Sequence, residues 1–260
     1  MSDVFLETTA VIGLAFGNHD AKGHINSHIP SGSRRITSQY VIYEVYRGYL
    51  RYLRLLHNKT LQLNGFSEIF EYVGRLHYMP SYVGAVLGNM KKYFDGDHPK
   101  LSDPDRLVHF RGFLRKEIRR GFARISAVAD VIINQLGCRD AGTPYEDDGG
   151  LYQHTLGTEL CGKHETCGLK GYAYSYRVDL GRIRDGLARI ISPDAETKAR
   201  IKYLRELYRV PKRDFPKTAC FRSSDALIVH ESPVSSTILT NNKKHIEPLS
   251  NLTPRNADYF

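Results

Sequence analysis

The sequence predicts an α/β fold in which helices flank a small parallel β-sheet. Two observations support this prediction: short apolar strands alternate with longer stretches of helical periodicity, and 41% of the 260 residues are hydrophobic against 25% charged. No apolar run of about 18 residues occurs, so we expect no membrane-spanning helix and no membrane partner. The first residues lack the basic and apolar stretches of a signal peptide, so we expect a cytoplasmic protein.

The first part of the chain predicts two strands. Residues 4–6 form a short apolar strand, and residues 10–16 continue it as an apolar helical stretch. Residues 17–35 are polar and contain three glycines, which predicts a loop, and residues 36–38 form the second strand. Apolar residues then recur at helical spacing, so a long helix is expected over residues 39–57.

The middle of the chain predicts mostly helices. The longest is expected over residues 104–136, with Asp103 as its N-cap and Pro104 at its first position. Other helices are expected over residues 67–77, 81–94, 179–191 and 193–209. Residues 138–176 are rich in glycine and tyrosine and contain three of the four cysteines, which predicts a loop-rich insertion.

The last part of the chain predicts a return to the sheet. A linker is expected over residues 211–222, a helix over 223–232 and a strand over 237–240, followed by a polar tail. We therefore expect one domain over residues 1–260, with residues 60–210 as a helical insertion within it.

Acidic residues lie close to the predicted strands. Glu7 follows the first strand, Glu44 lies in the helix after the second, and Asp225 lies near the start of the helix before the last strand. Thr240, Asn241 and Asn242 end that last strand. Ligands bind at the carboxyl ends of parallel strands, so these residues are expected to meet at one sheet edge. Clustered carboxylates need a cation, and hard oxygen ligands suit Mg²⁺ or Mn²⁺.

Each of these acids also has a structural interpretation. Asp225 lies in the first turn of a helix, where the helix dipole favours an acid. Glu44 could form a surface pair with Arg47, and Glu7 could cap the segment that follows it. Spacing alone does not decide between these interpretations and a metal site.

Four short strings, in this order along the chain, resemble the motifs of the PIN-domain family. They are residues 4–9, 36–48, 223–228 and 238–242. The first supplies an acid and a hydroxyl after a strand, the second a serine and a helical glutamate, the third an acid, and the fourth a hydroxyl-rich strand end. Two positions depart from the family pattern: Glu7 and Asn242 each stand where an aspartate is usual.

The resemblance implies a metal-dependent ribonuclease. Glu7, Glu44 and Asp225 would bind one or two Mg²⁺ or Mn²⁺ ions, and Asn242 would be an additional ligand. Thr8, Ser38 and Thr240 would orient the ligands or bridging waters. The ions would activate water and neutralise charge on a phosphodiester. The usual substrate of the family is single-stranded or structured RNA, and some bacterial members are toxins neutralised by a partner protein.

A basic surface is predicted on the longest helix. The chain carries 37 lysines and arginines against 28 acids, a net charge of +9, which favours a polyanionic partner such as nucleic acid. Cations at helical spacing form two adjacent rows that could follow a phosphate backbone: Arg111, Arg115 and Arg119, and Lys116, Arg120 and Arg124. The alternative is a solvated helix face, although Glu117 is the one acid within these rows.

The cysteine-containing insertion carries the spacing of a zinc site. Cys161, His164 and Cys167 form a Cys-x2-His-x2-Cys string. Thiolates and imidazoles suit Zn²⁺, and Cys138, His154 or Cys220 could complete a tetrahedral set. The alternative is that these cysteines are buried or free thiols.

The main hypothesis is thus a PIN-like endoribonuclease dependent on Mg²⁺ or Mn²⁺, with a structural zinc as an additional expectation. Two alternatives remain open: a PIN-like scaffold without cleavage activity that binds RNA or a protein, and a DNA-binding regulator that uses the basic helix. An inhibitory protein partner and a homodimer also remain open.

Overall fold

The computed structural model describes residues 3–76, 81–138, 150–152, 167–209 and 217–260. The chain divides into two compact units. Unit 1 comprises Met1–Val45, Arg124–Gly142 and Leu156–Phe260, and unit 2 comprises Tyr46–Ala123 and Thr143–Thr155. We describe each unit by itself.

Unit 1 is built on a five-stranded, fully parallel sheet with the strand order β3-β2-β1-β4-β5. The strands are β1 (Asp3–Leu6), β2 (Arg34–Ser38), β3 (Val131–Ile133), β4 (Ser236–Thr240) and β5 (Asn256–Tyr259). Phe5 of the central strand lies opposite Ile36 of β2 and Ile238 of β4, and all three are buried. The predicted α/β class with a small parallel sheet flanked by helices is confirmed.

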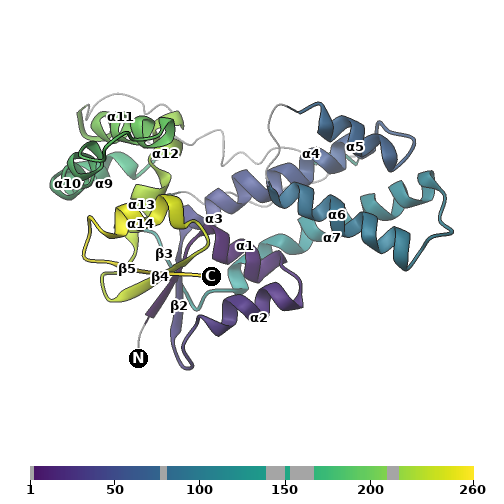
Figure 1. Ribbon diagram of the computed structural model, residues 1–260, viewed down its shortest axis with the longest axis horizontal. Coiled ribbons are helices and arrows are strands. Elements are labelled where there is room, and N and C mark those ends of the chain that lie inside the picture. The colour runs from purple at the N-terminus through teal and green to yellow at the C-terminus, as the bar shows by residue number, and fades with distance from the viewer. Residues whose placement is uncertain (1–2, 77–80, 139–149, 153–166, 210–216) are drawn as a thin grey trace. The chain divides into compact units, whose positions relative to one another are not determined.

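Helices cover both faces of this sheet (Figure 1). On one side lie α1 (Thr8–Phe16) and α2 (His19–Ser27), and on the other lie α13 (Ser224–Glu231) and α14 (Lys243–Ser250). This arrangement is expected when parallel strands on opposite sides of β1 are joined by right-handed crossovers. Unit 1 also contains α3 (Gln39–Val45), α9 (Leu169–Ser175), α10 (Arg177–Ala188), α11 (Ala195–Arg209) and α12 (Lys217–Arg222).

Unit 2 is helical. Its elements are the π-helical turn η1 (Tyr46–Leu50), α4 (Arg51–Thr60), α5 (Ser67–Gly74), α6 (Ser81–Gly96) and most of α7 (Asp103–Ala127). Its core contains Phe66, which meets Phe94 and Phe110 edge to face with ring centroids 5.0 and 5.3 Å apart. The three rings are almost fully buried, so this aromatic cluster is a main source of apolar stabilisation in unit 2.

Four expectations about single elements are wrong. The linker expected over residues 211–222 contains the helix α12. The expected loop over residues 17–35 contains α2, because the Asn18 side chain accepts a hydrogen bond from the Ala21 amide and starts a helix. The helix expected over residues 104–136 ends at Ala127, and Val131–Ile133 instead pairs with β2 as a strand. The polar tail forms α14 and β5.

Two glycines bring distant segments together in unit 1. Gly137 has a φ of +63°, and a Cβ atom there would lie 2.8 Å from the Cα atom of Gly168. The Gly168 amide also donates a hydrogen bond to the Gly137 carbonyl, at 3.2 Å. A side chain at either position would separate these backbones, so the contact requires glycine on both sides.

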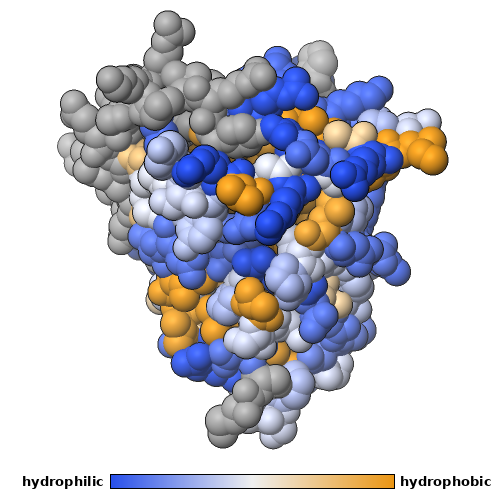
Figure 2. Space-filling model, turned by 90° about the vertical axis from the view of Figure 1, so that its left-hand side faces the viewer, coloured by the Kyte–Doolittle hydropathy of each residue, from blue (hydrophilic) through white to orange (hydrophobic). Residues whose placement is uncertain are grey.

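The surface of unit 1 carries some exposed apolar side chains. Val178 and Ile191 are 60% and 93% exposed. On the face that Figure 2 shows, hydrophobic side chains form separate groups among hydrophilic ones. Within the described part of the chain, no helix has the length and apolar character needed to cross a membrane.

Candidate metal centre at the sheet edge

The carboxyl ends of β1 and β4 form the point where the sheet reverses its direction of winding. From β1 the chain proceeds outward to β2 and β3, and it then returns to β4 and β5 on the other side of β1. Ligand sites of open α/β sheets lie at this kind of switch point. Here Glu7 directly follows β1 and Thr240 ends β4, and the Thr240 hydroxyl donates a hydrogen bond to Glu7 Oε2 at 2.9 Å.

Glu7 is a buried carboxylate held by three hydrogen bonds. The Thr9 amide and hydroxyl donate to its Oε2 atom at 2.9 and 2.7 Å, and Thr240 is the third donor. The side chain thereby caps α1, which confirms the structural interpretation of this residue. Because Glu7 is 2% exposed, burial raises its pKa, and the nearby Asp225 charge raises it further.

Glu44 lies on α3 and is half-buried. The hydroxyl of Thr8, the residue next to Glu7, donates a hydrogen bond to Glu44 Oε2 at 2.6 Å. The structure therefore connects the predicted first and second motifs through Thr8.

Asp225, in the first turn of α13, is paired with a residue that the sequence did not indicate. Its Oδ2 atom forms a close ion pair with Arg200 of α11. Arg200 is itself only 3% exposed. Its Oδ1 atom accepts a weak hydrogen bond from the side-chain amide of Asn242 at 3.4 Å. Burial raises the pKa of Asp225, and the positive charge of Arg200 opposes that rise.

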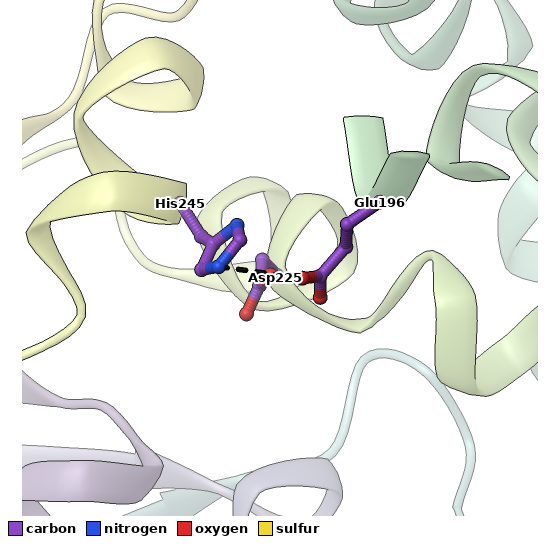
Figure 3. A group of neighbouring side chains, drawn as sticks. All are labelled: Glu196, Asp225 and His245. Carbon is purple, nitrogen blue, oxygen red and sulfur yellow. Dashed lines mark ion pairs between the residues drawn. The ribbon is translucent and has the colours of Figure 1, made fainter. Parts of the chain in front are cut away.

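A second group of side chains surrounds Asp225 (Figure 3). Glu196 of α11 and His245 of α14 point toward it, and the ligand atoms of the three residues all lie within 4.8 Å of one another. In the described ranges, no other set of three or more histidine, cysteine or acidic residues comes this close. Glu7 and Glu44 are therefore near the edge of the sheet but outside this tight group.

Ser38 ends β2 and is fully buried. Its hydroxyl oxygen accepts a hydrogen bond from the Val41 amide at 3.2 Å, so it caps α3. Burial raises the pKa of Glu231, and a hydrogen bond with the Ser38 side chain opposes part of that rise. Ser38 thus has a local structural role at the edge of the sheet.

Sequence reasoning missed Arg200, Glu196 and His245. Arg200 and Glu196 lie four residues apart on α11, within the expected helical insertion over residues 60–210. His245 follows Asn242 by three residues and lies in the first turn of α14. For His245 one sequence signal was available. Its position three residues after Asn242 places an imidazole in the first turn of any helix that follows β4.

The predicted basic face of α7 is only partly available to a ligand. Arg111 donates hydrogen bonds to the carbonyl and hydroxyl of Thr60 at 2.6 and 3.2 Å, and thereby caps the end of α4. Arg115 is half-buried, as is Arg124 at the end of the row. Lys116, Arg119 and Arg120 are exposed. These three cations form the part of the predicted surface that a polyanion could reach.

The predicted zinc set falls mostly outside the described residues, which include neither Cys161 nor His164. Cys138 and Cys167 are both half-buried. Each is the neighbour of one member of the Gly137–Gly168 contact, so the two ends of the cysteine-containing segment lie close together. Cys220 is buried, and its thiol contacts the Tyr40 hydroxyl at 3.5 Å.

Comparisons of the chain with protein-family models, with curated proteins and with solved structures gave no match. The resemblance to the PIN-domain family therefore rests on the four short motifs. It remains a prediction from the sequence.

Proposed function

We propose that this protein is a cytoplasmic PIN-like endoribonuclease that depends on Mg²⁺ or Mn²⁺. The observation that carries the proposal is the position of Glu7. This carboxylate is buried at the switch point of a parallel sheet and lies within electrostatic reach of a second, half-buried carboxylate, Asp225. Two such groups repel each other unless a cation lies between or beside them.

The donor set fits a hard divalent cation. Glu7, Glu44 and Asp225 offer carboxylate oxygens, and Asn242 offers an amide oxygen, which are the ligand types that Mg²⁺ and Mn²⁺ prefer. A bound ion would supply an activated water and neutralise charge on the scissile phosphate. Thr9 and Thr240 hold Glu7 in place, and Thr8 holds Glu44, so that these carboxylates are oriented before a substrate arrives.

The test is cleavage of single-stranded RNA and DNA by metal-stripped protein to which Mn²⁺ or Mg²⁺ is returned. The wild type is expected to cut RNA only with metal, and Glu44→Ala is expected to lose at least about 99% of that activity, in line with the loss of a group that positions a catalytic metal. Glu71→Gln, an exposed acid on α5, serves as the matched variant that should cut like the wild type. Equal cutting by Glu44→Ala would assign the activity to a contaminant.

RNA binding is expected to use the exposed cations of α7. Replacing both Lys116 and Arg120 with glutamine should weaken binding of single-stranded RNA and should reduce the slope of log K against log salt by about 1.4, or about 0.7 per lost phosphate contact. Fluorescence anisotropy at several salt concentrations measures both quantities. Lys92→Gln, an exposed lysine of α6, is the control. An unchanged slope in the double variant would place the RNA elsewhere.

One observation favours the alternative of a PIN-like scaffold without cleavage activity. The Arg200 guanidinium already neutralises Asp225, so this carboxylate has a positive partner without any metal. A folded wild type that binds RNA but never cuts it, with or without Mn²⁺, would favour the scaffold. The structural zinc and the inhibitory protein partner remain predictions from the sequence.

A further inference from the structure

Three side chains from three helices converge beside the proposed nuclease site. His245 Nε2 lies 3.4 Å from Glu196 Oε2, and both residues face Asp225 (Figure 3). A second ion pair between the same two helices, Lys244 Nζ to Asp194 Oδ2 at 3.0 Å, fixes the start of α11 against α14. The cluster is therefore assembled by the docking of α11.

We propose that Glu196, Asp225 and His245 bind a divalent transition-metal ion such as Mn²⁺, and that Arg200 is the cation that takes its place when the metal is absent. The proposal deepens the proposed function and rests on it for the use of the metal in catalysis. Metal binding itself depends only on the cluster.

The first argument is the position of Arg200. One of its terminal nitrogens, Nη2, contacts Asp225 and lies 4.0 Å from Glu196 Oε1, so a positive charge already lies between two of the three proposed ligands. The side chain is almost fully buried, yet its Nε atom has no hydrogen-bond partner among the described residues. A buried donor without a partner costs free energy, so the guanidinium fits this position poorly. A metal ion that displaced it would relieve that cost.

The second argument is the geometry of the ligand atoms. Atoms that bind one ion at about 2.1 Å are at most about 4.2 Å apart. The three ligand atoms lie within 4.8 Å of one another, so small side-chain rotations would bring them around one ion. Glu196 is exposed and His245 and Asp225 are half-buried, which leaves a side of the cluster open to solvent and to metal.

The third argument concerns the choice of metal. Mg²⁺ prefers oxygen ligands and keeps its waters, whereas an imidazole is a ligand for first-row transition-metal ions such as Zn²⁺. A site that includes His245 should thus select a transition metal over Mg²⁺. The four sequence motifs, which supply only oxygen ligands, leave that choice open.

The experiment measures Mn²⁺ binding by the full chain at pH 8, from the electron paramagnetic resonance signal of free Mn²⁺, with Mg²⁺ as competitor. We expect His245→Gln and Glu196→Gln each to weaken Mn²⁺ binding about tenfold or more, and His245→Gln to reduce the preference for Mn²⁺ over Mg²⁺. Arg200→Met should strengthen Mn²⁺ binding, because the competing cation is gone. Glu247→Gln, an exposed acid on α14, is the matched control and should bind like the wild type.

The possible outcomes separate this inference from the proposed function. The inference would be overturned if His245→Gln and Glu196→Gln both bind Mn²⁺ as tightly as the wild type while Glu7→Gln loses Mn²⁺ binding. That result would leave the nuclease proposal standing. Binding that depends on His245 in a protein that cuts no nucleic acid would support the inference and overturn the nuclease proposal. Weaker binding in Arg200→Met, with circular dichroism equal to the wild type, would overturn the role given to Arg200.

Discussion

Asp225→Ala is expected to destabilise the protein by about 3–5 kcal/mol and to abolish metal-dependent cleavage. The loss of stability comes mainly from Arg200, which is 3% exposed and would lose its closest carboxylate, keeping only Glu196 Oε1 at 4.0 Å. The loss of cleavage comes from removing a carboxylate shared by both proposed sets of metal ligands.

Urea unfolding followed by circular dichroism measures the first effect, and the double variant Arg200→Met/Asp225→Ala tests its cause. Removing both charges should recover most of the lost stability, because a buried ion pair replaced by uncharged groups costs little. Cleavage should not recover in the double variant. If the double variant is as unstable as Asp225→Ala, the ion pair is not the reason for the destabilisation.

Glu7→Gln is expected to make the protein more stable at neutral pH and to remove part of its pH dependence. The pKa of Glu7 is raised in the folded protein, so the unfolded chain releases this proton first as the pH rises above the ordinary value of 4.5. The folded state then holds more protons than the unfolded state, and the free energy of unfolding falls until Glu7 ionises in the folded protein as well. Glutamine has no such proton to lose.

Glutamine can also keep the local hydrogen bonds, because the three donors from Thr9 and Thr240 converge on the single atom Oε2. Thermal unfolding in metal-free buffers from pH 4 to 8 checks the prediction, with Glu71→Gln as an exposed control. The difference between Glu7→Gln and the wild type should grow with pH and shrink when Mn²⁺ is added, since a cation stabilises the ionised carboxylate. A difference independent of pH would show that Glu7 ionisation does not limit stability.

The sequence indicated those parts of the fold whose signal is local. The strands β1, β2 and β4 contain runs of apolar and β-branched residues, and each was expected within two residues of its observed position. β3 was missed because Val131–Ile133 also continued the apolar stripe of the helix before it. β5 was missed because its residues, Asn-Ala-Asp-Tyr, have no strand pattern, and only pairing with β4 defines it.

The candidate site divides in the same way. The sequence indicates Glu7, Glu44 and Asp225 as candidate site residues because they lie beside predicted strands. It indicates Thr8 and Thr240 because of the residues next to them. Arg200 contacts Asp225 across 25 positions of sequence, and that contact exists only once α11 has docked. Tertiary contacts of this kind leave no periodicity in the chain, so no local pattern could reveal them.

The strand order has a consequence for how the chain acquires its structure during synthesis. The Glu7–Thr240 hydrogen bond at the carboxyl ends of β1 and β4 joins residues 233 positions apart, whereas unit 2 consists mainly of residues 46–123. The ribosome thus releases β1 long before its neighbour β4 exists, and one edge of β1 stays unpaired while the helical unit can already fold. During that interval the nascent chain exposes an apolar strand whose unpaired edge could pair with another chain.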